Sequence, residues 1–311
     1  MVKLANQYGS SADRLLPSDI SATAKFVVEK LFQPKSKKKV TVFLCGADIR
    51  DKDTARARMA ALFAEYPRYE VHYPEDLFDD LLSGQGQHSL LSLENLLADS
   101  VDAVVILPES AGSLVELGAF ANNVQLAGKI VCLANSKYRH SKSFINFGPH
   151  RLIRSTVSGK VFHIDYAELS DPIKKHEIYR AIDSAVAQIK KCNPASRGVA
   201  NILEAETFVL SCIYISDYID NITLYHLLQA ATSKEMVLCE IAVKSALGRL
   251  MAKRLAMRTP RGYLVTHVGA ANVQSSFKRD LLDRARVELL NKQNRRNSTV
   301  SYDRLVRGAH L

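Results

Sequence analysis

The amino-acid sequence predicts an α/β protein, with a doubly wound parallel sheet followed by a smaller, mainly helical domain. Up to about residue 192, short β-branched and apolar runs alternate with amphipathic segments, which is the rhythm of βαβ units. Asn193–Gly198 contains a proline and a glycine and is typical of a linker. Beyond this linker the pattern becomes helical and the charge becomes strongly basic.

In the first part, each strand is predicted from an apolar run that is bounded by turn or helix signals. The strands are expected at 40–45, 69–73, 102–107, 129–133 and 160–164. The helices are expected at 18–33, 53–65, 75–82, 89–98, 113–125 and 171–192, with a polar loop over 135–159. Because strands and helices alternate in this way, a flavodoxin-like strand order is expected.

The second part predicts three helices, a hairpin and a fourth helix. These elements are expected at 200–216, 222–232, 234–257, 259–269 and 272–291. Three helices and a basic hairpin fit a winged helix-turn-helix, in which Glu235–Met257 supplies the recognition helix and Arg258, Arg261 and Tyr263 the wing. The predicted domains are therefore 1–195 for the α/β domain, 196–290 for the winged helix-turn-helix and 291–311 for a basic tail.

The composition excludes several classes of protein. The chain has 311 residues, of which 47% are hydrophobic, so it is long enough for two packed domains. It has no apolar run of about 18 residues and no apolar N-terminal leader, so we expect neither a membrane span nor a signal peptide, and a cytoplasmic location. The five cysteines are scattered and mostly flanked by apolar residues, which indicates buried free thiols rather than disulfides or a zinc site. The nine histidines show no paired spacing with them, so no structural metal is expected. No cofactor is expected either.

The net charge of +10 is concentrated near the C-terminus. Residues 201–243 hold one basic and six acidic residues, whereas residues 244–311 hold fifteen basic and four acidic residues. Such a local excess is typical of a surface that binds nucleic acid. The expected contacts are Lys244, Arg249, Lys253, Arg254, Arg258 and Arg261. A second basic cluster, Lys35–Lys39, is interpreted as a solvated approach to the first strand.

The strongest functional signal is the stretch from Val101 to Gly118. A predicted strand is followed by the small-residue loop Ser110–Ser113 and then by a helix that carries Glu116 in its first turn. In an open α/β sheet, ligands bind at the carboxyl ends of the strands, and the helix dipole is expected to keep this carboxylate ionised. A positioned carboxylate suits attack on a glycosidic carbon or stabilisation of an oxocarbenium ion. Glutamate is also common in first helical turns simply because it caps the helix. The residues around Glu116 therefore decide between a structural and a catalytic role.

The other strand ends supply further candidate site residues. Small residues there let a ligand approach the backbone, and Asp48 and Arg50 suit a ribose and a phosphate. The predicted substrate-binding residues are Cys45, Gly46, Ala47, Asp48, Arg50, Ser110, Gly112 and Ser113. Glu94 stands eight residues before Asp102 and is the second predicted catalytic carboxylate; the alternative for Glu94 is a solvated position on a helix.

These residues resemble those of the nucleoside 2-deoxyribosyltransferases, over about residues 38–165. The resemblance implies a flavodoxin-like fold in which Glu116 is the nucleophile on C1′, Glu94 acts on the leaving base and Asp102 is a structural residue. The sequence departs from the family at Ser110, where the family has an aspartate, and lacks the family's tyrosine after the first strand. We therefore expect a different nucleotide substrate and prefer NAD, because Arg50 and the basic loop of this domain favour a phosphorylated molecule over a bare nucleoside.

Over nearly its full length, the chain resembles the deoxyribosyltransferase-like effectors encoded beside bacterial retron reverse transcriptases. These proteins join such a domain to a winged helix-turn-helix. The resemblance implies a toxic activity in anti-phage defence that is restrained by a complex with the retron reverse transcriptase and its RNA-linked single-stranded DNA (msDNA). Self-association is expected as well.

Three other interpretations remain open at this point. The protein is alternatively a non-enzymatic DNA-binding regulator that senses a nucleotide, or a structural subunit of a nucleoprotein assembly whose α/β site is inert. A third alternative is a phosphoribohydrolase that resembles the cytokinin-activating enzymes. Those enzymes have paired glycines before their glutamate, which Pro108–Ser113 lacks.

Overall fold

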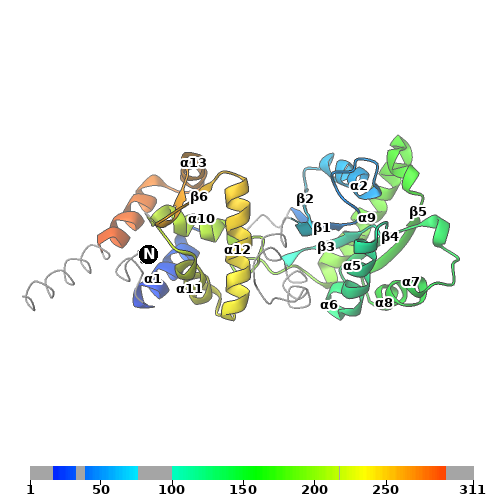
Figure 1. Ribbon diagram of the computed structural model, residues 1–311, viewed down its shortest axis with the longest axis horizontal. Coiled ribbons are helices and arrows are strands. Elements are labelled where there is room, and N and C mark those ends of the chain that lie inside the picture. Colours follow the sequence, from blue (N-terminus) through cyan, green and yellow to red (C-terminus); the bar gives the residue numbers. More distant parts are fainter. Residues whose placement is uncertain (1–16, 33–38, 76–99, 217, 292–311) are drawn as a thin grey trace, which may run out of the picture. The chain divides into compact units, whose positions relative to one another are not determined.

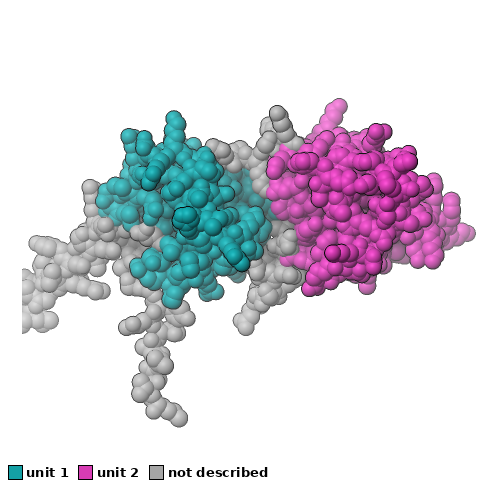
Figure 2. Space-filling model, turned by 90° about the horizontal axis from the view of Figure 1, so that it is seen from above, with its two compact units in different colours: residues 1–34, 198–311 teal, residues 35–197 magenta. Residues whose placement is uncertain are grey.

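The computed structural model describes residues 17–32, 39–75, 100–216 and 218–291. The chain forms two compact units, which Figure 2 distinguishes by colour. One unit comprises residues 35–197, and the other comprises residues 1–34 together with 198–311.

The unit of residues 35–197 is built on a five-stranded parallel sheet (Figure 1). Its strands are β1 (Val40–Cys45), β2 (Tyr69–His72), β3 (Ala103–Ile106), β4 (Ile130–Asn135) and β5 (Lys160–Ile164). They are hydrogen-bonded in the order β2-β1-β3-β4-β5, and every pair is parallel. The predicted flavodoxin-like order is confirmed, with its topological switch point between β1 and β3.

The helices of this unit cover the sheet and bury its β-branched strands. Helices α2 (Ala55–Ala64) and α9 (Pro172–Cys192) contribute to one apolar core with alternate residues of β1, β3 and β4. The unit also contains α5 (Ala111–Asn122), α6 (Val124–Ala127), α7 (Phe144–Phe147) and α8 (Pro149–Ser155). Because the strands are buried on both faces, they read as continuous apolar runs in the sequence.

Two predicted segments of this unit differ from the structure, and two others cannot be compared. Helix α5 begins at Ala111, earlier than predicted, because the Ser110 side chain caps it. The predicted loop 135–159 contains α7, which Ser143 caps, and α8, which begins at Pro149. The helices predicted at 75–82 and 89–98 lie almost entirely outside the described residues.

The second unit is helical with one small hairpin. It contains α1 (Pro17–Lys30), α10 (Ala205–Ile215), α11 (Asn221–Thr232), α12 (Met236–Ala252), β6 (Ala256–Thr259), β7 (Gly262–Val265), α13 (His267–Ser276) and a helix over 279–291. Ile219 forms an isolated antiparallel bridge to Tyr263 of β7. From α10 onward, helix, bridge, helix, turn, helix and hairpin follow one another in the order of a winged helix-turn-helix.

The first helix belongs to this second unit rather than to the α/β unit. Its apolar residues Ala24, Val27 and Leu31 are fully buried, and α1 packs against α11 and α10. The Ser211 hydroxyl of α10 also donates a hydrogen bond to the Leu31 carbonyl at 2.9 Å. The compact unit therefore differs from the predicted domain 1–195, because an amphipathic helix near the N-terminus finds its apolar partner more than 180 residues later.

In the described ranges, no helix is both long enough and apolar enough to cross a membrane. All five cysteines are free thiols; Cys192 is exposed, contrary to the expectation of buried thiols, because it ends α9 at the linker.

Candidate active site

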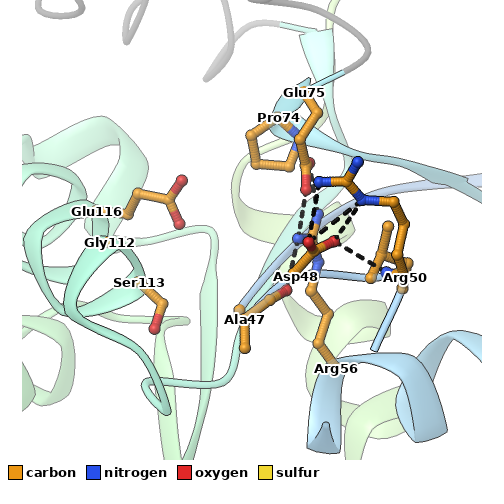
Figure 3. Close-up of a pocket in the computed structure, with 11 residues that line it drawn as sticks. Ala47, Asp48, Arg50, Arg56, Pro74, Glu75, Gly112, Ser113 and Glu116 are labelled. Carbon is orange, nitrogen blue, oxygen red and sulfur yellow. Dashed lines mark hydrogen bonds and ion pairs between the residues drawn. The ribbon is translucent and has the colours of Figure 1, made fainter. Parts of the chain in front are cut away.

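A cavity of about 500 Å³ lies at the carboxyl ends of β1 and β3, at the switch point of the sheet (Figure 3). It is lined by Gly46, Ala47, Asp48, Ile49, Arg50, Arg56, Pro74, Glu75, Gly112, Ser113 and Glu116. The structure thus brings together most of the residues that the sequence nominated from β1 and from the start of α5. Two predicted substrate-binding residues, Cys45 and Ser110, do not line the cavity itself.

Glu116 reaches this cavity from the second turn of α5. Because Ser110 is the N-cap and Ala111 the first helical residue, the predicted position in the first turn is wrong. One carboxylate oxygen of Glu116, Oε2, is buried and has no hydrogen-bond partner among the described residues. A buried acceptor without a partner is costly, so this oxygen is suited to receive a donor from a ligand, such as a sugar hydroxyl.

The environment of Glu116 raises its pKa to about 7. Burial is the main cause; Glu75 adds repulsion, whereas Arg56 and a hydrogen bond with the Cys45 thiol favour the ionised form. The expectation that the helix dipole keeps Glu116 fully ionised is wrong. The dipole acts mainly within the first turn, and burial outweighs it here.

Arg56 and Glu75 both line the cavity, and neither was among the predicted site residues. Arg56 is only 2% exposed, and its Nη1 and Nη2 donate to the Glu75 carboxylate at 2.6 and 2.7 Å. It also donates to the carbonyls of Leu44 and Ala47 at the end of β1. A Cβ at Gly46 would lie 2.7 Å from the Cβ of Arg56, so only glycine allows this approach.

Glu109 is a third residue that was not among the predicted site residues. Its carboxylate accepts hydrogen bonds from the backbone N–H groups of Ala55 at 2.8 Å and Arg56 at 2.9 Å, at the start of α2. It also accepts a longer one, of 3.4 Å, from Ala47. Glu109 therefore caps α2 and ties the end of β3 to the loop after β1, which fixes the walls of the cavity.

Asp48 and Arg50 form an ion pair that lines the cavity. The Arg50 guanidinium donates to both Asp48 oxygens at 3.0 to 3.2 Å, and these bonds lower the pKa of Asp48. The Arg50 side chain is 88% exposed. An exposed guanidinium that a carboxylate orients suits recognition of a phosphate group.

The remaining predicted residues have structural partners or lie outside the described part of the chain. The hydroxyls of Ser110 and Ser113 bond to each other at 3.0 Å and complete a capping box at the start of α5. Asp102 is buried and accepts from the Thr41 N–H and from Arg197, which fits its predicted structural role. Glu94 lies outside the described residues.

Within the described residues, no group of histidine, cysteine or acidic side chains has the arrangement of a metal site. Burial also raises the pKa of the Cys45 thiol well above its usual range, so Cys45 acts as a hydrogen-bond donor to Glu116 rather than as a thiolate.

The predicted nucleic-acid contacts in the second unit fall into two groups. Lys244 pairs with Glu240 at 2.5 Å, and Lys253 pairs with Glu206 at 2.7 Å. Arg249 is 9% exposed and bonds to Glu206, Ser245 and the Ile202 carbonyl. Arg254, Arg258 and Arg261 are exposed at or near the hairpin, where Arg261 lies 4.1 Å from the centre of the Tyr218 ring.

The fold and the cavity define a class of protein: a flavodoxin-like α/β domain with a buried carboxylate at its strand ends, followed by a winged helix-turn-helix arrangement. The family model described as "STM3845 retron effector protein" matches residues 48–256, and the chain belongs to this family of retron effectors.

Two proteins from Escherichia coli are similar to this chain in sequence. The first, whose name reads "Retron Ec86 putative ribosyltransferase/DNA-binding protein", is 42% identical over 274 residues, covering 86% of this chain and 89% of the relative. The retron Ec73 protein of the same description is 34% identical over 143 residues, covering 44% of this chain and 45% of the relative. The predicted kinship with retron effectors is confirmed. Of the cavity residues, all but Gly46 and Ala47 lie within residues 48–256, which the family model matches.

Proposed function

We propose that this retron effector cleaves the N-glycosidic bond of a nucleotide, with NAD as the preferred substrate, and that Glu116 is the catalytic carboxylate. The proposal is carried by one observation: at a strand-end cavity of about 500 Å³, a buried oxygen of Glu116 has no hydrogen-bond partner within the described part of the chain. The name of the Ec86 relative, which mentions a ribosyltransferase, supports the same class of chemistry.

In the proposed reaction, the ionised Glu116 carboxylate attacks C1′ of the ribose, or shields it as an oxocarbenium ion forms. The bond from C1′ to the base nitrogen breaks, and its electron pair goes to that nitrogen. Water then attacks C1′, the glutamate oxygen leaves as carboxylate, and the water proton passes to solvent. The products are the free base and the remaining ribosyl nucleotide.

The carboxylates that line the cavity favour a substrate whose base can leave without receiving a proton. A neutral purine or pyrimidine needs a proton as it leaves, whereas the positively charged nicotinamide ring of NAD leaves as a neutral molecule. Asp48 and Glu75 are paired with arginines and have lowered pKa values, so they are poor proton donors. Glu94 is the proposed acid for a neutral base, and Arg50, oriented by Asp48, is the proposed contact to a phosphate.

The second unit is proposed to hold the effector on its partners, the retron reverse transcriptase and the msDNA. The name of the Ec86 relative, which includes DNA binding, supports this assignment. The exposed arginines of the hairpin, rather than the paired cations of α12, are the proposed phosphate contacts.

The test is incubation of the purified full chain with NAD, nucleotides and nucleosides, followed by mass spectrometry of the products. We expect wild type to release nicotinamide and ADP-ribose in equal amounts, and Glu116→Gln to release neither. Glu177→Gln, at an exposed position of α9, is the matched control. Equal turnover by wild type and Glu116→Gln would refute the assignment; release of another base would keep Glu116 and reject NAD.

A further inference from the structure

The segment that follows β4 combines positive charge with an absence of acidic residues. Residues 136–160 contain no aspartate or glutamate; their basic residues are Lys137, Arg139, Lys142, Arg151, Arg154 and Lys160. Among the described residues, none of these six forms a salt bridge. Their charge is therefore available to an anionic partner, unlike that of Lys244, Arg249 and Lys253.

The same segment exposes large aromatic side chains to solvent. Tyr138 is 58% exposed, Phe144 86% and Phe147 63%. Phe144 and Phe147 stand three residues apart on α7, so they lie on one face of this short helix. The Lys137 ammonium lies 5.7 Å from the centre of the Tyr138 ring. Three exposed aromatic side chains in one short segment are typical of an interaction surface.

These rings are presented by a loop with fixed geometry. The Asn146 side-chain amide donates to the carbonyls of Tyr138 and Ser141 at 3.0 and 2.7 Å, and its oxygen lies 2.8 Å from Nδ1 of the buried His150. A Cβ at Gly148 would lie 2.8 Å from the Phe144 carbonyl oxygen, so the chain turns tightly there. A pre-organised surface loses less entropy when it binds.

We propose that this aromatic–basic surface, formed by Tyr138, Phe144, Phe147 and the cations of residues 136–154, binds single-stranded nucleic acid. The rings stack on unpaired bases, and the cations contact phosphates. None of these residues lines the cavity of Glu116, so the surface is a separate site. It adds a second contact to the nucleic-acid partner in the proposed function and does not depend on the chemistry at Glu116.

Charge argues against a second copy of this chain as the occupant. Two copies that met through this surface would bring unpaired cations of the same sign together, which is unfavourable. Exposed bases offer both planar faces and negative charge, whereas the bases of a duplex are stacked and unavailable.

The test is fluorescence anisotropy of the full chain with a labelled oligothymidylate of about 12 nucleotides, over a range of salt concentrations. Every protein carries Arg258→Gln and Arg261→Gln, so that the hairpin contributes little. One variant adds Phe144→Ala and Phe147→Ala, with the exposed Ile173→Ala of α9 as its control. A second variant adds Lys142→Gln and Arg151→Gln, with the exposed Lys52→Gln and Lys191→Gln as its control.

We expect the aromatic variant to bind at least about tenfold more weakly, with duplex binding unchanged. The charge variant is expected to lower the slope of log affinity against log salt by about 0.7 for each cation removed. Its residues are exposed and unpaired, so it remains informative should the aromatic variant fold poorly. Affinity and slope equal to those of the controls would overturn the proposal, as would a change in oligomeric state without a change in affinity. Failure of the background protein itself to bind would reject this surface, while leaving base release at Glu116 untouched.

Discussion

The two units differ in whether their predicted functional residues remain available to a ligand. In the α/β unit, candidates far apart in the sequence meet at one cavity, because parallel strands end at the same edge of the sheet. In the helical unit, three of the six candidate cations are paired with carboxylates: Arg249 is nearly buried, whereas Lys244 and Lys253 form their ion pairs at the surface. Topology thus predicts where strand-end residues converge, whereas a count of charges does not show which of them remain available.

The comparison is tested most strongly by Glu116→Gln. We expect turnover to fall by at least ~10²-fold, because the substitution keeps the shape of the side chain and removes the charge that acts on C1′. The same variant is expected to be more stable than wild type at pH 8, by an amount on the order of 1–3 kcal/mol.

The sign of that stability change follows from the pKa of Glu116, which burial raises to about 7. When the pKa of a carboxyl group is higher in the folded than in the unfolded protein, its stabilising contribution is fully present at pH values below the unfolded-state pKa. For Glu116 this contribution is lost as the pH rises through about 7. Glutamine does not ionise, so the Glu116→Gln variant keeps its stability as the pH rises. Thermal unfolding at pH 4 and pH 8 measures the effect, and a variant that is less stable than wild type at both pH values would contradict it.

The sequence predicted the strands and most helices correctly because their signals are local. β-branched runs gave β1 and β3, and Asp171–Pro172 gave the start of α9. The supports of the cavity were not predictable in this way, since Glu109 bonds to a backbone N–H 62 residues earlier. Arg56 did leave a signal, because it stands on the apolar face of α2 with Met59 and Phe63. A charged residue in that position requires a buried partner.

The next largest effect is expected at Arg249, which contrasts with its predicted role. Arg249→Met removes the ion pair to Glu206 and the bond to the Ile202 carbonyl, and should lower the free energy of unfolding by about 2 kcal/mol. The exposed Arg258→Met is the matched control and should change stability by less than about 0.5 kcal/mol. Denaturant titration measures both. An unchanged midpoint for Arg249→Met would contradict a stabilising role for these bonds.

The pH dependence of turnover is a smaller and more specific test of the cavity. Because the nucleophile must be ionised, kcat/KM should rise about tenfold per pH unit below 7 and level off above it. Cys45→Ala removes a hydrogen bond that favours the ionised form, so it should move the midpoint to higher pH. Cys132→Ala, at a buried position on β4, is the matched control. A profile that falls with rising pH would mean that Glu116 acts as an acid.

The smallest expected effect concerns the hairpin, where the comparison between paired and unpaired cations is sharpest. Arg258→Gln and Arg261→Gln together should weaken binding of the nucleic-acid partner by several-fold and lower the salt slope by about one unit for each residue. Lys244→Gln should change neither the affinity nor the salt slope, because the charge of this lysine is already neutralised by Glu240. Affinity of the full chain for msDNA, measured at several salt concentrations, separates these outcomes. An equal loss in Lys244→Gln would show that the ion pairs of α12 open on binding, and that charge alone, not its pairing in the free protein, determines the nucleic-acid surface.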